Sequence, residues 1–481
     1  MKQILVFVTV AISIAGSAQN VGIGTTNPQQ KLDVNGAVKI GSNGTDSPVP
    51  GTMRWNEANQ DFEGFNGSKW LSLTGGKSGL GSPENYIAQT GIIDSYLKTG
   101  TEGFYSTAFG RTILPTNNRL VVSAEQATIS PGAGSSQVTQ AGIVMVYENK
   151  NGSYSSIREL HSPAPGENFY FGTGVDCDSK NIVVGERAKI GTNNHQGTAH
   201  VYGAEGIISL QASLVAPDAA SGDFFGNAVT VDQNRIAVGA PGKTVATKAG
   251  QGRVYFYTKS VATWGYKQFL FSPENIEKAR FGASVSMKGN YLAVGAPGES
   301  TNSDTYTGKV FVYTYSPSSQ LWVSHKVITP QGPESHAGFG YKVRLVSEDT
   351  LLVVEESLWA GREDRVFIYT KNSSDDWIRN AMLECPDGSI DFGTDVDLRG
   401  KELIIGAYEG KVNGISKGKA YVYRHNGTAW EVSHILTNTD QSKNTRFGGG
   451  VMLGEDRILV GASSADGYYL NSGVIYEFLR Q

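Results

Sequence analysis

The sequence predicts an all-β protein. Its main body is a seven-bladed β-propeller of four-stranded antiparallel blades, closed by an N-terminal strand that completes the last blade and preceded by a small β-rich, stalk-like region. Two observations carry this prediction: the dipeptide Phe-Gly returns seven times at nearly constant spacing, and the intervals hold four strand-like segments each. In addition, 60 of the 481 residues are Gly, and such a content beside many Val, Tyr and Thr is typical of strands joined by tight turns.

The first element along the chain is an export signal. The segment MKQILVFVTVAISIAGSAQ places one Lys before an apolar run and then small residues, with Gly16 and Ala18 where a cleavage site needs them. We expect residues 1–18 to be a signal peptide and Gln19 to begin the mature protein. No later segment approaches the roughly 20 apolar residues that a membrane-spanning helix needs. The mature protein is therefore expected outside the cell, secreted or at the cell surface, without a membrane span.

Residues 19–76 do not follow the repeat. They alternate apolar and polar residues between Asn-Gly and Pro-Gly turns, as in NVGIGTTNPQQKLDVNGAVKIG, which predicts short strands and hairpins. Few of these residues could form a core alone, which indicates partner chains. The region resembles the stalk or attachment modules of bacterial fibre-like surface proteins and phage tail fibres, and this resemblance implies a homotrimer. Residues 77–90 are expected to form a linker, because the segment TGGKSGLGSPEN, residues 74–85, has the composition of a flexible chain.

The repeat occupies residues 91–481. Successive Phe-Gly positions differ by 62, 54, 56, 58, 53 and 55 residues, and a period of this length indicates repeated supersecondary units. The repeated Phe residues are Phe109, Phe171, Phe225, Phe281, Phe339, Phe392 and Phe447.

Each unit supplies the strands of one blade. Unit three reads FGNAVTV, RIAVGAP, GRVYFY and TWGYKQFLFSP, with a polar turn or loop after each segment. Four antiparallel strands repeated around an axis describe a β-propeller. The phrase Gly-Ala-Pro-Gly, which occurs after RIAV and again after YLAV, is interpreted as a terminator of the second strand, because Pro removes a donor and Gly permits a bend. A phosphate-binding loop is disfavoured because no helix pattern and no Lys-Ser/Thr pair follows.

The last unit ends after its third strand, at GVIYEFLRQ. Ahead of Phe109, the segment GIIDSYLKTG has the spacing of a fourth strand, since Leu97 stands three residues before Gly100 as Leu214 stands before Pro217. A strand from the opposite terminus would remove the exposed edge of an open array. We therefore predict that residues 91–98 pair beside residues 473–478.

These motifs together resemble the FG-GAP repeat family in the form found in secreted bacterial proteins. The family also includes the propeller of integrin alpha subunits. The resemblance implies extracellular binding or adhesion, with a protein or a glycan as the partner and without catalysis. Integrin-type repeats carry calcium in Asp-x-Asp-x-Asp-Gly turns between the first two strands. Here the nearest match, Asp176 with Asp178, lacks the third acid and the Gly, so we interpret these carboxylates as solvated turn residues; we expect no metal site, and calcium is the one cofactor left open.

The net charge disfavours two classes of partner, and the cysteine content bears on how the protein is stabilised. A formal net charge of −4 gives no electrostatic case for binding nucleic acid or an anionic membrane. The only cysteines, Cys177 and Cys385, belong to different units and different strand positions, so they are expected to be separate thiols rather than a disulfide. Stability must then come from a large buried core.

Catalysis is not predicted, because neither His-Glu-x-x-His nor Cys-x-x-Cys is present. Two alternatives stay open. A secreted hydrolase or lyase acting on polysaccharide could assemble its site from several blades, and it would show clustered carboxylates with perturbed protonation at the propeller axis. A structural component of a surface appendage would be supported by the stalk-like region alone.

The predicted binding face follows from the topology. If the first strand of each blade is innermost, the loops that join strands two to three and four to one emerge on one face of the disc. Loops on a rigid scaffold usually carry binding specificity, and aromatic and Arg residues are favoured at the centres of interfaces. On this face the candidate ligand-binding residues are Tyr306, Trp359, Arg362, Tyr468 and Tyr469.

Overall fold

The structure is a computed structural model in which the chain divides into two compact units, residues 1–82 and 83–481. The residues that the structure describes are 21–23, 32–34, 52–56, 61–65, 70–72, 91–94, 107–130, 136–150, 152–187, 196–300, 306–330, 336–357, 364–412, 414–438, 444–466 and 472–479. These residues form strands, turns and bends, and they include no helix that could cross a membrane.

The first unit contains short strands, as expected for residues 19–76. An antiparallel sheet is formed by β3 (Met53–Asn56), β4 (Asp61–Phe65) and β5 (Trp70–Ser72). Two further strands, β1 (Val21–Ile23) and β2 (Leu32–Val34), pair in parallel. This second pairing differs from the expected hairpins, since a tight two-residue turn joins only antiparallel strands. The stalk role, the homotrimer and the linker at residues 77–90, which lies outside the described residues, stay predictions.

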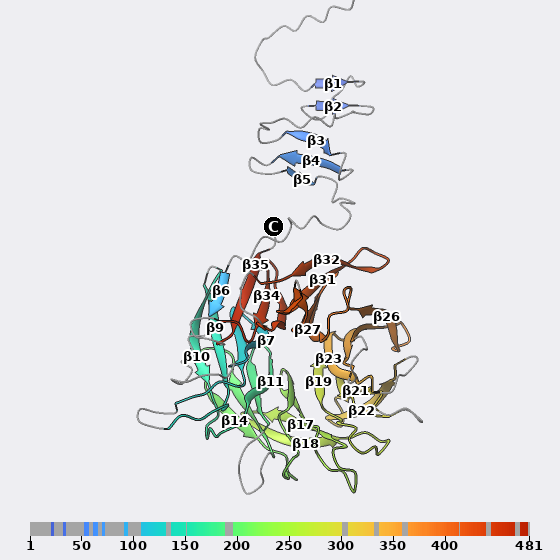
Figure 1. The fold of residues 1–481 in the computed structure, drawn as a ribbon. Helices are drawn as coiled ribbons and strands as arrows, with labels where there is room; N and C mark the ends of the chain where they lie inside the picture. Colours follow the sequence, from blue (N-terminus) through green and yellow to red (C-terminus); the bar gives the residue numbers. More distant parts are fainter. Residues whose placement is uncertain are drawn as a thin grey trace, which may run out of the picture. The chain divides into compact units, whose positions relative to one another are not determined.

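The second unit is the predicted propeller: within the described residues, seven four-stranded antiparallel sheets surround one axis (Figure 1). Blade 1 comprises β7 (Phe109–Thr116), β8 (Arg119–Ala124), β9 (Ile143–Lys150) and β10 (Ser153–Leu160). Blade 2 comprises β11 (Phe171–Cys177), β12 (Asn181–Glu186), β13 (Thr198–Gly203) and β14 (Leu210–Leu214). Blade 3 comprises β15 (Ala228–Asp232), β16 (Arg235–Ala240), β17 (Arg253–Ser260) and β18 (Thr263–Leu270).

The remaining blades repeat this pattern. Blade 4 comprises β19 (Ser284–Lys288), β20 (Tyr291–Ala296), β21 (Lys309–Ser316) and β22 (Leu321–Ile328). Blade 5 comprises β23 (Phe339–Ser347), β24 (Thr350–Glu355), β25 (Arg365–Lys371) and β26 (Trp377–Glu384). Blade 6 comprises β27 (Phe392–Arg399), β28 (Glu402–Ala407), β31 (Lys419–His425) and β32 (Trp430–Leu436), with the hairpin β29 (Lys411–Val412) and β30 (Ile415–Ser416) inserted after β28. Blade 7 comprises β33 (Phe447–Leu453), β34 (Arg457–Ala462), β35 (Val474–Leu479) and β6 (Gly91–Asp94).

The predicted closure of the ring is confirmed. Strand β6 pairs antiparallel with β35, with Ile93 opposite Ile475 and Ile92 opposite Tyr476. Residues 95–98 of the predicted pairing lie outside the described residues. The first strand of blade 7, β33, also contacts the first strand of blade 1, β7, so the seven blades form a closed circle. Strand β6 thus pairs with the edge of β35 that would otherwise be open, and it gives blade 7 four strands like the other blades.

The Phe-Gly dipeptide anchors each blade. All seven Phe side chains are buried, and each packs against aromatic rings of the third strand of its own blade, as Phe281 does edge-to-face on Phe311 with ring centroids 5.3 Å apart. All seven following Gly residues have positive φ angles between 84° and 104°. Only Gly adopts such angles without a steric penalty, and at Gly282 a Cβ would also lie 2.7 Å from the carbonyl oxygen of Arg253. The dipeptide therefore combines an aromatic anchor with a backbone reversal.

The Gly of Gly-Ala-Pro has a different role from the one expected. Strand β16 runs through Gly239 and ends at Ala240, so Pro241 alone terminates it. A Cβ on Gly239 would lie 2.0 Å from the carbonyl oxygen of Gly282 in the next blade. Gly239 is thus required for the close approach of two blades rather than for a bend. The same contact recurs at Gly185, Gly295, Gly406 and Gly461, each against the Phe-Gly glycine of the following blade.

The core lies between the blades. Each of seven clusters of buried apolar side chains joins strands of two neighbouring blades; one of them, for example, packs Val201 of blade 2 against Phe225 and Tyr255 of blade 3. Both cysteines are free thiols in separate blades, as predicted. A chain without disulfides therefore obtains its stability from these layers of buried side chains.

Candidate functional site

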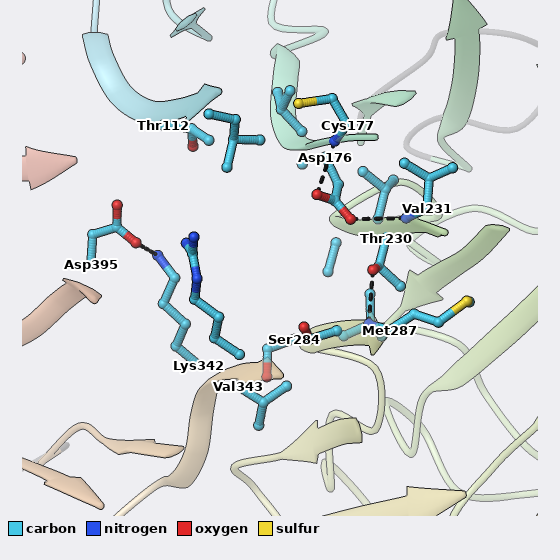
Figure 2. Close-up of a pocket in the computed structure, with 18 of the residues that line it drawn as sticks. Thr112, Asp176, Cys177, Thr230, Val231, Ser284, Met287, Lys342, Val343 and Asp395 are labelled. Atoms are coloured by element: carbon cyan, nitrogen blue, oxygen red, sulfur yellow. Dashed lines mark hydrogen bonds and ion pairs between the residues drawn. The ribbon is translucent and has the colours of Figure 1, made fainter. Parts of the chain in front are cut away.

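The first strands of the seven blades are innermost and surround a central channel of about 1140 Å³. Figure 2 shows part of its wall, where side chains from β11, β15, β19, β23 and β27 converge. The wall is polar: Asp176, Thr230, Lys342 and Asp395 all line it. The channel along the propeller axis thus contains carboxylates of the kind that the catalytic alternative requires.

A ring of hydrogen bonds between neighbouring blades uses many of these polar groups. The side chain of the residue five places after one repeat Phe accepts the backbone N–H of the residue six places after the next Phe. Four such bonds are formed: Val231 to Asp176 at 2.8 Å, Met287 to Thr230 at 2.9 Å, Leu345 to Ser286 at 2.9 Å and Leu453 to Asp397 at 2.8 Å. These oxygen atoms therefore hold the inner strands together.

The ring is interrupted where the sequence changes. Blade 7 places Met452 at the acceptor position, and the facing residue of blade 1 is Pro115, which has no N–H to donate. Blade 1 places Leu114 there, and the facing N–H of Cys177 is instead bound by the carboxylate of Asp176, at 2.9 Å. Blade 5 has Arg344, which reverses the direction of the contact and forms an ion pair with Asp397 at 2.8 Å.

Protonation in the channel is perturbed, as the catalytic alternative requires. Burial raises the pKa of Asp176 to about 6, and burial also raises the pKa of Asp397 although Arg344 opposes the shift. Both carboxylates accept backbone N–H groups of the following blade, and Asp395 accepts both the N–H of Val451 at 2.9 Å and the ammonium of Lys342 at 2.6 Å. Their oxygen atoms are engaged in contacts between blades, which favours a structural role.

The turn that comes nearest to a calcium motif is also engaged. Asp178 accepts N–H groups of Lys180 and Asn181 from its own turn and of Gln233 from blade 3, at 2.8, 2.7 and 2.6 Å. The interpretation as solvated turn residues is therefore wrong for Asp176, which lies within β11. Asp178 does stand in the partly exposed turn after β11, but it also joins blade 2 to blade 3. Within the described ranges, no three His, Cys, Asp or Glu side chains gather closely enough to hold a metal ion. The expectation of no metal site, with calcium left open, stays a prediction.

One short segment matches a nucleophile pattern by letters alone. Residues 414–418, GISKG, fit Gly-x-Ser-x-Gly, in which Ser would stand on a sharp turn between a strand and a helix. Here Ser416 ends β30 of a small hairpin, and its hydroxyl donates to the carbonyl of Glu409 at 3.1 Å. This setting does not provide the exposed, activated hydroxyl that the pattern implies.

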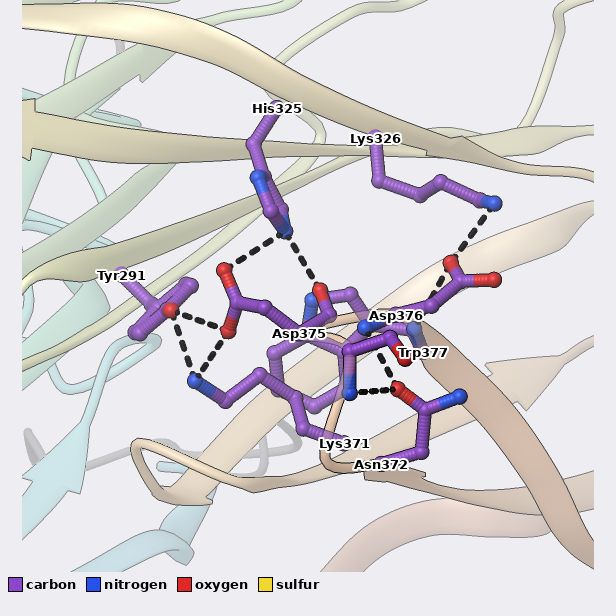
Figure 3. A network of polar contacts seen from close by, with 9 residues as sticks. Tyr291, His325, Lys326, Lys371, Asn372, Asp375, Asp376 and Trp377 are labelled. Carbon is purple, nitrogen blue, oxygen red and sulfur yellow. Dashed lines mark hydrogen bonds and ion pairs between the residues drawn. The ribbon is translucent and has the colours of Figure 1, made fainter.

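A second polar cluster lies between blades 4 and 5, where β20 begins and where the turn joins β25 to β26 (Figure 3). The hydroxyl of Tyr291 donates to Asp375 at 2.7 Å and accepts from the ammonium of Lys371 at 2.6 Å. His325 approaches the other Asp375 oxygen at 3.6 Å. Burial raises the pKa of Tyr291, so this phenol is not poised to act as a base. The cluster is a tie between two blades on the face opposite the predicted binding loops.

The predicted binding face carries a cavity of about 500 Å³, which shares Arg187, Asn227 and Arg280 with the wall of the central channel. It lies over blades 2 to 5 and is lined only by residues of the loops between strands two and three and between strands four and one, or of the first residues that follow them. Tyr306, one of the five predicted residues, lines it, while Trp359, Arg362, Tyr468 and Tyr469 lie outside the described residues. The cavity is lined by Arg187, Phe224, Asn227, Pro241, Gly242, Gly250, Lys278, Arg280, Pro297, Gly298, Tyr306 and His336.

Sequence reasoning missed the cations of this cavity. Arg187 follows β12 in the loop ERAKIGTNNHQG, and Arg280 stands directly before the Phe-Gly of unit four. The guanidinium of Arg187 stacks on the ring of Tyr170, 4.6 Å from its centroid, and Tyr170 donates to Gln140 at 3.0 Å. A usable signal existed, because only units four and seven place Arg before Phe-Gly.

The geometry of the blades agrees with the comparison to known families. Residues 208–257, 264–313 and 377–423 match the model of the FG-GAP repeat. Three segments of the propeller are FG-GAP repeats. The matched segments fall within blades 2 to 6, and the same buried Phe and left-handed Gly recur in every blade of the FG-GAP propeller.

Curated relatives share only part of this FG-GAP propeller. A stretch of 106 residues is 35% identical to integrin alpha-2 of Bos taurus, and it covers 19% of this chain. Integrin alpha-2 of Mus musculus matches with the same identity and coverage. The chain spans only 9% of the length of these relatives.

Solved structures resemble the chain more distantly. A 6-phosphogluconolactonase-like protein of Bacteroides uniformis is 10% identical, with a TM-score of 0.45 over 68% of this chain and 85% of its own. A protein of Lactobacillus plantarum is 12% identical, with a TM-score of 0.46 and the same coverage. Likenesses at this level say nothing about the function of the FG-GAP propeller described here.

Proposed function

We propose that this FG-GAP propeller is a non-catalytic binding or adhesion module that acts outside the cell through the loop face. The observation that supports this most is the cavity of about 500 Å³, because every residue that lines it belongs to the loops of that face or directly follows one. Pockets of this size, walled by a few polar and aromatic side chains on a rigid scaffold, are typical of ligand sites.

The extracellular setting is part of the proposal. Residues 1–18 have the charge, apolar run and small residues of an export signal. The resemblance to integrin alpha subunits implies a role at the cell surface, and residues 19–76 would then attach the propeller to a larger assembly. The ligand of such a module is an extracellular protein or a glycan.

Catalysis in the central channel is the competing proposal, because Asp176 has a pKa raised to about 6 by burial. A polysaccharide hydrolase or lyase would need carboxylates that are free to exchange protons with a substrate. The oxygen atoms of Asp176 and Asp397 instead accept backbone N–H groups, which supports binding over catalysis. Reducing-end release from polysaccharides that falls in an Asp176→Asn variant while the fold persists would favour the enzyme.

The proposed function is tested with the mature protein, residues 19–481. Binding to envelope fractions, extracellular matrix proteins and glycan arrays is measured for the native chain, for Tyr306→Ala on the loop face and for Tyr266→Ala on the exposed outer strand β18. We expect at least one surface to be bound, and Tyr306→Ala to weaken that binding while Tyr266→Ala leaves it unchanged. Absence of binding to every preparation, or equal loss in both variants, would contradict the proposal.

A further inference from the structure

The cavity on the loop face has an unusual balance of charge for a chain with a formal net charge of −4. Three permanent cations line it: Arg187 from the loop after β12, and Lys278 and Arg280 from the loop that joins blade 3 to blade 4. None of the described lining residues is acidic. The described lining of the cavity therefore carries a net positive charge.

These cations have no close carboxylate partner among the described residues. Arg187, Lys278 and Arg280 form no ion pair within 4.0 Å there, and the carboxylate that acts on Arg280, that of Glu356, does so only at longer range. Arg187 is held in place by its stacking on Tyr170, so less conformational freedom is lost when it binds. Guanidinium groups bind carboxylates and sulfates through paired N–H donors, which makes an anion the matching ligand.

Aromatic side chains line the same cavity. Phe224 is 38% exposed, a high value for a large apolar ring. Tyr306 stacks with His336 at a centroid distance of 5.5 Å, and both line the cavity. A ligand that fits must therefore combine anionic groups with a body that can lie against aromatic rings.

The main chain around the cavity is already bonded. The N–H groups of Gly242 and Gly298 donate to carbonyls of the adjoining loops at 3.1 and 3.0 Å, and those of Lys278 and Arg280 do so at 2.9 and 3.0 Å. An extended peptide is normally held by backbone hydrogen bonds of this kind, and these amides are not free to provide them. Recognition by side chains alone suits a saccharide better than a peptide strand.

We propose that this cavity binds an anionic saccharide, one that carries carboxylate or sulfate groups. Arg187, Lys278 and Arg280 bind the anionic groups, and the rings of Phe224 and Tyr306 contact the apolar face of a sugar. The inference rests on the proposed binding function and names the ligand class of the same face.

The test measures binding by calorimetry to four probes: an oligogalacturonate, a heparin-derived oligosaccharide, a neutral cello-oligosaccharide and poly-glutamate. We expect one of the two anionic saccharides to bind, and the tighter one identifies carboxylate or sulfate as the recognised group. Arg187→Gln and Arg280→Gln should each weaken binding about tenfold, since one charge-assisted hydrogen bond is worth that much. The matched controls Arg379→Gln and Lys267→Gln, on outer strands β26 and β18, should change nothing. Thermal unfolding verifies that all variants are folded.

Several outcomes overturn the inference: equal binding of the neutral saccharide, binding of poly-glutamate alone, insensitivity to the Arg variants, or no binding to any probe. Its failure is distinguishable from failure of the proposed function. If the protein binds an envelope or matrix preparation, and this binding survives Arg187→Gln and Arg280→Gln, then only the saccharide assignment is wrong. If no surface is bound at all, the binding function is wrong as well.

Discussion

Neighbouring blades pack differently at two boundaries, the one between blades 3 and 4 and the one between blades 5 and 6. The difference lies where the second strand of one blade meets the Phe-Gly glycine of the next. At the first, Gly239 of β16 lies against Gly282 so closely that a Cβ would stand 2.0 Å from its carbonyl oxygen. At the second, the equivalent position of β24 is Val354, whose Cγ1 would lie 2.6 Å from a Cβ on Gly393. The inner strands β23 and β27 are accordingly less closely packed than β15 and β19.

The two boundaries also bind the repeat Phe differently. The N–H of Phe281 donates to the carbonyl of Gln251 at 2.8 Å, just before Gly252, whose φ is 88°. In blade 5 the residue equivalent to Gly252 is Asp364, and its carboxylate accepts the N–H of Phe392 at 3.1 Å. A side chain has thus replaced a main-chain acceptor.

This difference shows the role of the repeated glycines. They allow the backbones of two neighbouring blades to approach closely, and where they are replaced in blade 5, an acidic side chain connects the two blades. The substitution brings buried carboxylates with it: burial raises the pKa of Glu356 to about 7, of Asp391 to about 6 and of Asp364 above its ordinary value. Blade 5 therefore adds three buried carboxylates to the dependence of stability on pH, whereas the segment that joins blades 3 and 4 faces one such group, Glu299, whose pKa burial raises to about 7.

The largest effect is expected from adding volume at the regular boundary. Gly239→Ala places a methyl group against a backbone carbonyl that cannot move independently, and it should cost about 3 kcal/mol or more of unfolding free energy. At the irregular boundary the loss of volume should matter instead, and Val354→Ala should cost about 2 kcal/mol. Urea denaturation followed by Trp fluorescence measures both. A Gly239→Ala variant as stable as the native chain would refute the close-approach argument.

A somewhat smaller effect is expected at the replaced acceptor. Asp364→Ala removes the partner of two backbone N–H groups, those of Ser357 and Phe392, and should cost about 2 kcal/mol because a buried donor is left unsatisfied. Asp364→Asn keeps one carbonyl oxygen and should cost less. Equal denaturation midpoints for the two variants would show that the carboxylate is not the tie between blades 5 and 6.

The dependence on pH sharpens the comparison further. Because the pKa of Glu356 is raised from 4.5 to about 7, the folded protein holds a proton that the unfolded chain releases earlier. The contribution of this group to stability is fully present below about 4.5 and is lost as the pH rises through about 7. Glu356→Gln should therefore make the melting temperature depend less on pH between pH 5 and pH 8, and the variant should melt at a higher temperature than the native chain at pH 8. If the variant shows the same change of melting temperature with pH as the native chain, groups other than Glu356 cause that change.

The smallest effect is expected at the cluster between blades 4 and 5. Asp375 is half exposed, so its ion pair with Lys371 is screened by water, and Asp375→Ala should cost at most about 1 kcal/mol. Thermal unfolding in low and high salt measures this, with a smaller difference expected in high salt. A loss as large as that of Gly239→Ala would mean that the outer ties, not the inner glycines, hold the blades together.

Much of this architecture could be predicted from the chain alone. The seven Phe-Gly dipeptides determine the number of blades. The missing fourth strand of the last unit indicated that residues 91–98 would complete it, and residues 91–94 of that range form β6. Such features are local or periodic, so they are visible in one sequence. The parallel pairing of β1 with β2 and the true role of Gly239 were not predictable in this way, because both depend on which backbones come close together.

The candidate site was predictable only as a face. Topology placed the binding loops on one side, and Tyr306 indeed lines the cavity there. Arg187 and Arg280 were missed because each is a single cation in a different unit, about 90 residues apart in sequence, with no motif around it. The polar ring of the channel was missed as well, although alignment on Phe-Gly would have shown a hydrogen-bonding residue five places later in several units.

By itself, the amino-acid order determined the fold class, the count of blades and the closure of the circle, because strand pattern and turn chemistry are written over a few residues and then repeated. The closed tertiary structure alone decided that Asp176 accepts the N–H of Val231, that Gly239 faces Gly282, and that three cations and two aromatic rings line one cavity. The physical reason is distance along the chain: groups from different blades meet only after the ring has closed, and no local pattern encodes the distance between them.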